Sequence, residues 1–356
     1  MIRTPRHRLQ GSGPHPCVGQ NGAAMAPEPA TLSVEGEPPP TRRPRRTMAL
    51  SALAGTVIAF VCIAFVIARM SAQWGEVGDD IADAEPAWIA AAALAATAAM
   101  AWIASCWQRV IALLGPTPPR GRTMAWYFAG ELGKYVPGTV WPVLGRGELA
   151  RRGGVPRARA YPSVALSLAA LYLSALALAA VLVPLDLAKQ SQSPGALALL
   201  ALLPLGLLAL HPRVLTAARD LLVRFTGRGA DIVVPPWRAT IGVVVSYLPA
   251  WLGIWAATWC VARSLDPDAP LLRIGIATAL SWTAGFVAVP VPAGAGVREA
   301  VFVAASGLPV GLGATIAVGS RLVFLLVDVA GAGVAGLQAS TTVSSRTRRA
   351  GRSPGS

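Results

Sequence analysis

Long apolar runs, separated by short charged segments, limit the fold of this chain more than any other feature of its sequence. The runs are about 17–26 residues long, which is the length a helix needs to cross the hydrocarbon core of a bilayer. Strands of a membrane barrel would be about ten residues long and would alternate apolar with polar residues. With 54% hydrophobic and 13% charged residues, the chain is too apolar for a water-soluble domain. The sequence therefore predicts an all-α polytopic membrane protein.

We expect about six full transmembrane helices and two interrupted re-entrant hairpins. The expected spans cover residues 48–68, 87–114, 161–183, 195–210, 239–262 and 311–337. The expected hairpins cover residues 123–152 and 271–306, each with prolines and glycines inside an apolar stretch. Together these elements form an expected transmembrane domain at 48–338, with repeat halves at 48–183 and 195–337.

The two ends of the chain have a different composition. Residues 1–47 and 339–356 are polar and rich in arginine, with no apolar period, so we expect disordered basic tails. Met1, Met25 and Met48 are alternative starts between which the sequence does not decide. The first tail is too long and polar for a signal peptide, so the first span is expected to be an uncleaved anchor.

Charge distribution predicts the orientation. Arginines precede the first span and acidic residues follow it, which places the N-terminus in the cytoplasm under the positive-inside rule. The expected layout puts 24 of the 31 Lys and Arg residues on the cytoplasmic side, including those of segment 146–159, and both termini in the cytoplasm. We expect a multi-pass plasma-membrane protein. The net charge of +14 arises largely from arginines that flank apolar runs, so no nucleic-acid partner is expected.

The stretch FVAVPVPAGAGVREA, residues 286–300, cannot be a continuous helix. Pro290 and Pro292 lack the N–H that a helix requires, and Gly294 and Gly296 allow the chain to turn. Irregular backbone within a bilayer is tolerated only where protein buries it or it lines a wet cavity. The stretch is thus a candidate site, with an extramembrane turn as the alternative. Pro137 and Gly138 interrupt the first hairpin in the same way.

The two halves show signs of an inverted repeat. Gly154-Val155-Pro156 follows the first hairpin and Gly307-Leu308-Pro309 follows the second, 153 residues later. Ser167 matches Ser320 at that offset, although so short a match can arise by chance among abundant glycines and prolines. Interrupted segments at corresponding positions of two halves indicate the binding site of a transporter.

These motifs resemble a known family. GELGKYVPGTVWPVLGR with the RRGGVP turn, and VPVPAGAGVREAVF with ATIAVGSRLVFLLVDVAG, are similar to the transmembrane flippase-like domain of the lysylphosphatidylglycerol synthases over roughly residues 48–338. The resemblance implies a stand-alone, lipid-translocating or lipid-handling membrane domain. The chain departs from the family at Ser167-Leu168, where Glu-Arg is common. Only about 18 residues follow the last span, so the aminoacyl-transferase domain and lipid aminoacylation are not expected.

Known catalytic arrangements are difficult to build from this sequence. Its three histidines are His7, His15 and His211, which gives neither a metal site nor a Ser-His-Asp triad. The four cysteines have no paired spacing, and there is no Walker A motif or dinucleotide fingerprint. We therefore expect no enzyme activity, no cofactor and no metal.

Charges within the apolar segments are the strongest functional signal. Each costs about 2.5–3.5 kcal/mol at the centre of a spanning helix, so it usually faces a cavity or a partner of opposite charge. Arg321 and Asp328 are seven residues apart, about two helical turns, and share one face of the last span. One interpretation is that Glu299 pairs with Arg321 only to lock the bundle. The other is that the charges line a groove for a charged headgroup. The expected substrate-binding residues are Glu131, Lys134, Gly138, Gly294, Gly296, Arg298, Glu299, Arg321 and Asp328.

Two functions are compatible with these features. We favour a flippase or transporter for a lipid with an anionic phosphate headgroup, either a phospholipid or a polyprenyl-phosphate-linked lipid. Lys134 and Arg298 would hold the phosphate, with Glu299 and Arg321 orienting the Arg298 guanidinium. The alternative is a non-transporting membrane subunit or scaffold for envelope lipid or glycolipid synthesis. The expected partners are membrane lipids and, in the second case, a lipid-synthesis enzyme or glycosyltransferase.

Overall fold

The computed structural model describes the backbone of residues 84–135, 141–187, 201–227, 229–287, 294 and 296–350, and side chains only up to residue 337. All of these belong to one compact unit, residues 49–356. Residues 1–83, with the first expected span, lie outside the described residues, as do Gly138 and residues 188–200. The expected domain boundaries and tails therefore stay predictions.

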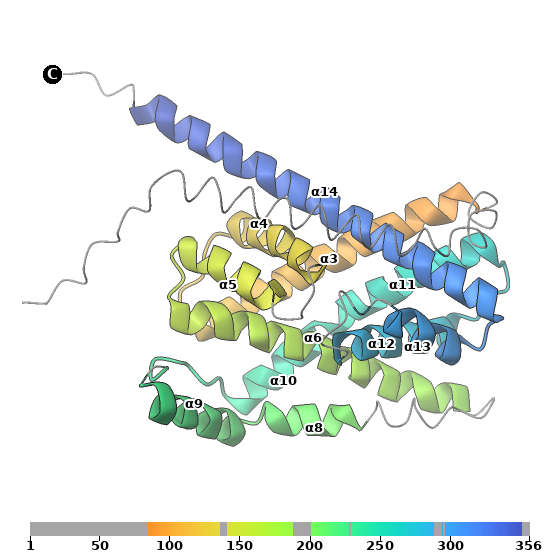
Figure 1. Ribbon diagram of the computed structural model, residues 1–356, viewed down its shortest axis with the longest axis horizontal. Coiled ribbons are helices and arrows are strands. Elements are labelled where there is room, and N and C mark those ends of the chain that lie inside the picture. The colour runs from red at the N-terminus through yellow and green to blue at the C-terminus, as the bar shows by residue number, and fades with distance from the viewer. Residues whose placement is uncertain are drawn as a thin grey trace, which may run out of the picture. The chain divides into compact units, whose positions relative to one another are not determined.

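The described part of the chain is helical and contains four helical segments long and apolar enough to cross a membrane. They are α3 (Pro86–Leu114), α6 (Arg157–Leu187), the pair α10 (Trp237–Ser246) and α11 (Leu248–Leu265), and α14 (Val310–Ala350). They pack into one bundle, in which α14 crosses α3 obliquely in the view of Figure 1. The all-α membrane fold is confirmed, and these elements match four of the expected spans.

Small residues allow α3 and α11 to pack closely. A Cβ atom built on Gly253 of α11 would lie 3.0 Å from the Cβ of Ala99 and 3.4 Å from the carbonyl oxygen of Ala95 on α3. Such contacts are typical of helix pairs in membranes, where association depends on van der Waals packing rather than on the hydrophobic effect. The core beside them contains Trp107 and Trp251, whose indole N–H groups donate to Ser163 Oγ and to the Leu171 carbonyl. Both large side chains are thus buried without an unpaired donor.

The first hairpin consists of α4 (Arg120–Glu131), the 3₁₀ turn η1 (Leu132–Tyr135) and α5 (Trp141–Arg152). The chain enters it from the end of α3 and leaves it into α6, and Arg159 of α6 donates a hydrogen bond to the Pro116 carbonyl before α4. The start of α4 and the end of α5 therefore lie at the same end of the bundle.

The second hairpin consists of α12 (Leu271–Val287) and α13 (Val297–Ser306), the latter with the bounds expected from the sequence. Its outer ends also lie together, because a Cβ on Gly307, just after α13, would touch the guanidinium of Arg273 in α12. Arg273 pairs with Asp186 at the far end of α6, 3.5 Å away. The second hairpin thus opens at the end of the bundle opposite to the first.

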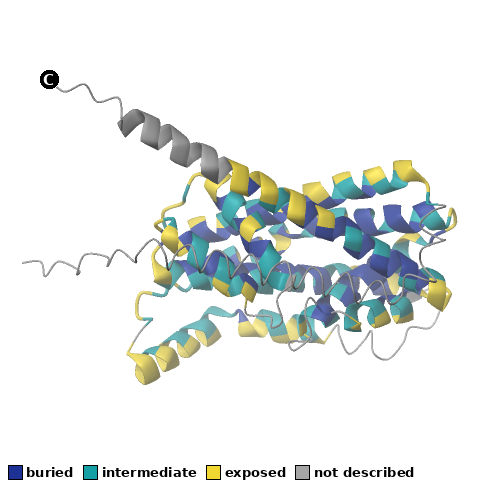
Figure 2. Ribbon diagram, turned by 45° about the horizontal axis from the view of Figure 1, so that its top comes forward, coloured by how far each residue is buried: buried dark blue, intermediate teal, exposed yellow. Residues whose placement is uncertain are grey.

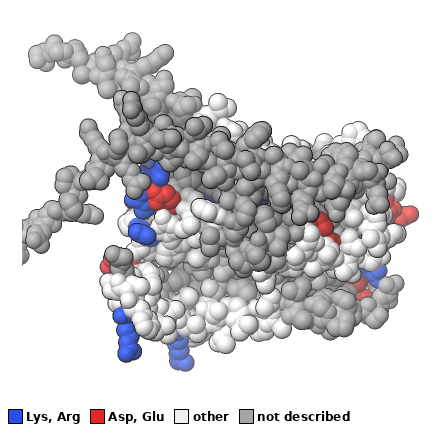
Figure 3. All heavy atoms as spheres, in the orientation of Figure 1, with Lys and Arg blue, Asp and Glu red and all other residues white. Residues whose placement is uncertain are grey.

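One end of the bundle is rich in arginine. The end with the first hairpin carries Arg120, Arg122, Arg151, Arg152, Arg157 and Arg159. Figure 3 shows basic side chains at this end of one face, around α5 and α9 (Pro212–Thr226).

Glu148 on α5 accepts hydrogen bonds from Arg151, Arg152 and the Tyr161 hydroxyl. The Arg151 hydrogen bond, supported by that of Arg152, lowers the pKa of Glu148 to about 2.

α8 (Leu202–Ala209) and α9 lie along the outside of the bundle. Figure 2 shows that much of α9 is exposed, whereas the central helices are largely buried. The expected span 195–210 is described only from residue 201, where α8 is a helix of 8 residues. The number of full spans therefore stays a prediction.

The packing of α3 against α11 leads to a test with a matched control. Gly253→Leu should lower the free energy of unfolding in detergent by about 1–3 kcal/mol, because the side chain overpacks the interface. Gly242→Leu on α10 introduces the same side chain where no atom lies within 4 Å, and should leave stability unchanged or slightly raised. Thermal unfolding midpoints measure both effects. Equal midpoints for the two variants would contradict the close contact.

Candidate functional site

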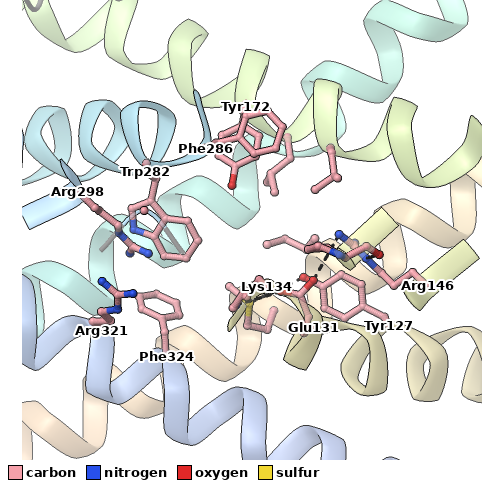
Figure 4. Close-up of a pocket in the computed structure, with 17 residues that line it drawn as sticks. Tyr127, Glu131, Lys134, Arg146, Tyr172, Trp282, Phe286, Arg298, Arg321 and Phe324 are labelled. Carbon is pink, nitrogen blue, oxygen red and sulfur yellow. Dashed lines mark hydrogen bonds and ion pairs between the residues drawn. The ribbon is translucent and has the colours of Figure 1, made fainter. Parts of the chain in front are cut away.

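A central cavity of about 110 Å³ lies between the inner ends of the two hairpins. Its volume is enough for several water molecules or a small anionic group. α3, α6 and α14 complete its walls, as Figure 4 shows in close-up. The charged side chains that line the cavity are Glu131, Lys134, Arg146, Arg298 and Arg321.

The first hairpin contributes a cluster of three charges to this cavity. The Lys134 ammonium lies 3.0 Å from a carboxylate oxygen of Glu131, and the Arg146 guanidinium lies 3.5 Å from the other oxygen. Arg146 also lies over the ring of Tyr127, 5.2 Å from its centroid. Glu131 and Arg146 are buried, and the side chain of Lys134 is 24% exposed. The hairpin thus holds two cations around one carboxylate.

Asp328 joins α14 to this cluster. It is fully buried, and one of its carboxylate oxygens lies 2.6 Å from the Lys134 ammonium. Lys134 therefore bridges a carboxylate of α4 and a carboxylate of α14. Removal of one member of a buried ion pair leaves an uncompensated charge, which costs far more than the pair itself contributes.

The second hairpin places a cation against an aromatic ring. The guanidinium of Arg298 lies 3.7 Å from the centroid of the Trp282 ring, which is cation–π geometry. Trp282 also makes edge contacts with Trp251 and Phe324. The face of one indole thus holds Arg298 at the cavity wall (Figure 4).

Glu299, one residue later, points to α14. Its carboxylate lies 2.5 Å from Nη1 of Arg321 and accepts a hydrogen bond from the Gly296 N–H, as in one half of a capping box. Arg321 is 5% exposed, and its Nη2 has no hydrogen-bond partner among the described residues. A buried guanidinium nitrogen without a partner can donate a hydrogen bond to an acceptor atom of a ligand in the cavity.

Glycine is required where the second hairpin turns. Gly294 has φ +67°, which favours glycine, and a Cβ there would lie 2.5 Å from the Cα of Gly285. Gly294 lines the cavity, and Gly296 precedes the first turn of α13. Gly138 lies outside the described residues, so its place in the site stays a prediction.

The structure thus brings seven of the nine expected site residues together around one cavity or its ion pairs, and Gly296 adjoins them through its N–H bond to Glu299. It also shows that Arg321 and Asp328 form ion pairs with different hairpins. Arg321 pairs with Glu299 of the second hairpin, and Asp328 pairs with Lys134 of the first. The Glu299–Arg321 pair of the first interpretation is present, and Arg321 also lines the cavity, so both interpretations of these charges stay predictions.

Arg146 is the main residue that the sequence analysis missed. We assigned it to a cytoplasmic segment, but it is 2% exposed and faces the cavity. The physical reason is helix periodicity: α5 turns Arg151 and Arg152 outward and Arg146 inward. The aromatic walls were also missed, because Tyr127, Tyr172 and Phe286 come from separate helices.

The position at which the chain departs from the expected family pattern also lies near the cavity. Leu168 lines it, and Ser167 is buried with its hydroxyl 2.6 Å from that of Tyr247. An uncharged hydrogen bond and an apolar contact thus occupy this part of α6.

Comparison with protein families gives one match. The model for the lysylphosphatidylglycerol synthase TM region covers residues 52–336. A comparison with curated proteins finds no match. Among the residues that the structure describes, no group of His, Cys, Asp and Glu side chains could hold a metal ion.

The bridging role of Lys134 gives a test of the site's energetics. Lys134→Met should lower the free energy of unfolding by about 3–5 kcal/mol, because it leaves buried Asp328 without this cation. The double variant Lys134→Met/Asp328→Asn should recover a substantial part of the lost stability. It no longer buries the charge of Asp328, and Glu131 still has Arg146 as a cationic partner. A double-mutant cycle on thermal or chemical unfolding measures the coupling. Strictly additive effects would contradict a direct ion pair.

Proposed function

The chain belongs to the family of the lysylphosphatidylglycerol synthase transmembrane region, and on this basis we propose that it is a transporter of a lipid with an anionic phosphate headgroup. The lipid is a phospholipid or a polyprenyl-phosphate-linked lipid. The observation that supports this most directly is the convergence of four cations on one cavity between two Pro/Gly-broken segments. The proposal is for transport and not for catalysis.

The charge balance of the cavity supports an anionic ligand. Among the described residues, four cations line it, whereas three carboxylates lie in it or pair with its cations: Glu131, Asp328 and Glu299. With all of these groups ionised, one positive charge is in excess. A phosphodiester carries one negative charge, so its binding would make the site neutral.

The arrangement of donors suits a phosphate oxygen. Arg298 and Arg321 lie on the same side of the cavity in Figure 4, opposite Lys134 and Arg146. Arginine guanidinium groups bind phosphate through paired N–H donors, and Nη2 of Arg321, which has no partner in the described part of the chain, offers one such donor. The start of α13 adds backbone N–H groups and the positive end of a helix dipole.

We also propose an inverted topology around this site. Each hairpin would be re-entrant, the first from the cytoplasm and the second from the outer side, with both termini cytoplasmic in the plasma membrane. The opening of the hairpins at opposite ends of the bundle and the arginines around the first one support this layout.

The transport proposal is tested by reconstitution in liposomes with fluorescent lipids that differ in headgroup. Arg298→Ala should abolish headgroup-dependent movement while expression and folding are maintained, because the cavity loses a phosphate donor. Arg298→Lys should recover movement only in part, since a single ammonium cannot reproduce the planar fork. Arg151→Ala removes an exposed arginine of α5 that does not line the cavity, and serves as the control.

Two outcomes would contradict this proposal. Wild-type protein that moves none of the phosphate lipids would favour the non-transporting subunit. Arg298→Ala protein that misfolds, with unchanged transport per folded molecule, would make Arg298 a structural residue.

Cysteine accessibility tests the topology. In intact cells, a cysteine introduced at Val297, the partly buried first residue of α13, should react slowly with membrane-impermeant maleimides, because a re-entrant α13 would begin inside the membrane. A cysteine at Asp268 should react from outside. A cysteine at Arg122, at the opposite end of the bundle, should react only after permeabilisation. Fast reaction at residue 297, equal to that of a fully exposed loop, would exclude the re-entrant arrangement.

A further inference from the structure

α9 has an apolar face that no described part of the chain covers. Its residues Val214, Ala217, Ala218, Leu221, Leu222 and Phe225 share one side at the helical period and are all exposed. Phe225 is 79% exposed and Leu221 55%. Isolated exposed apolar residues are ordinary, but a continuous apolar face on one helix marks an interaction surface.

The helix itself is well formed. The His211 ring accepts a hydrogen bond from the Arg213 N–H at its start, and Gly227 ends it in the left-handed conformation with φ +64°. Thr216, Arg219 and Val223 lie on the side away from Phe225 and are only partly exposed, and Leu215, between the two sides, packs against the core. The apolar face of α9 is thus directed away from the bundle.

Arginines border this face. Arg213 and Arg224 lie along one edge of it, whereas Arg219 lies further round on the other side and pairs with Asp220, 2.8 Å away. Cationic edges around an apolar face are typical of helices that lie at the surface of an anionic bilayer. In a pair of α9 helices from two copies these arginines would lie close to one another, which disfavours self-association through this face.

The position of α9 fits the same partner. The His211 ring lies 5.2 Å from the ring of Trp237, the residue that begins the α10–α11 span. Tryptophan at the end of a span commonly lies at headgroup depth. α9 therefore starts at the level where a bilayer would change from hydrocarbon to headgroups, at the arginine-rich end of the bundle (Figure 1).

We infer that α9 is an interfacial helix that binds anionic phospholipid, with Phe225 and Leu221 inserted among the acyl chains and its arginines at the phosphates. This inference does not depend on the transport proposal.

The test uses the full chain, with its native cysteines replaced, in vesicles of phosphatidylcholine alone or mixed with phosphatidylglycerol. An environment-sensitive fluorophore is attached to a cysteine at Phe225→Cys or, as the matched control, at Asp220→Cys. At position 225 we expect blue-shifted emission, quenching by spin-labelled lipid and protection from aqueous iodide, all stronger in the mixed vesicles. Position 220 should stay open to iodide. Replacing Arg213, Arg219 and Arg224 by Gln should remove the difference between the two vesicles.

Equal iodide quenching at both positions in both vesicles would overturn the inference. So would protection of position 225 that appears only together with cross-links between copies, because a second chain would then cover the face. Protection with no dependence on phosphatidylglycerol would overturn the preference for anionic lipid.

Discussion

Two ion pairs between α14 and the hairpins are the interactions on which the interior of this bundle depends. Arg321 pairs with Glu299 of the second hairpin, and Asp328, two turns later, pairs with Lys134 of the first. In the described residues, the inner end of the first hairpin is the 3₁₀ turn η1, and α13 of the second begins after Gly296. A single spanning helix therefore fixes both, since separating either pair would leave a charge buried in an apolar bundle.

The same arrangement explains how the cavity is polar without being loosely built. Aromatic rings hold two of its cations from the side: Tyr127 for Arg146, and Trp282 for Arg298. Trp282 is in turn fixed by edge contacts with Trp251 and Phe324, so elements α11, α12, α13 and α14 meet around one indole. Cations held in place in this way need little reorganisation when a ligand binds, which favours affinity.

The sequence predicted the helices and most of the residues that gather at the cavity because the relevant signals are local. Apolar run length defines a span, a proline ends a helix, and a charge such as Arg298 stands out inside an apolar stretch. Arg146 gives no such signal, because it lies near Arg151 and Arg152 in a polar segment, and only the packing of α5 against α4 and α6 turns it inward. Which partner each charge takes is likewise a matter of tertiary structure. Glu131, Glu299 and Asp328 were all expected in the site, but nothing in their spacing distinguishes Lys134 from Arg321 as the partner of Asp328.

α14 is also far longer than a bilayer requires. It continues without a break from Val310 to Ala350, 41 residues, whereas its apolar span ends at Leu337. At 1.5 Å per residue, the part beyond the span adds about 20 Å of rod to the helix that carries Arg321 and Asp328. Because the distal end lies far from the ion pairs, a tilt of a few degrees about them would displace that end by more than it displaces the cavity wall. Any tilt of α14 about the buried pairs would therefore be largest at residues beyond its apolar span.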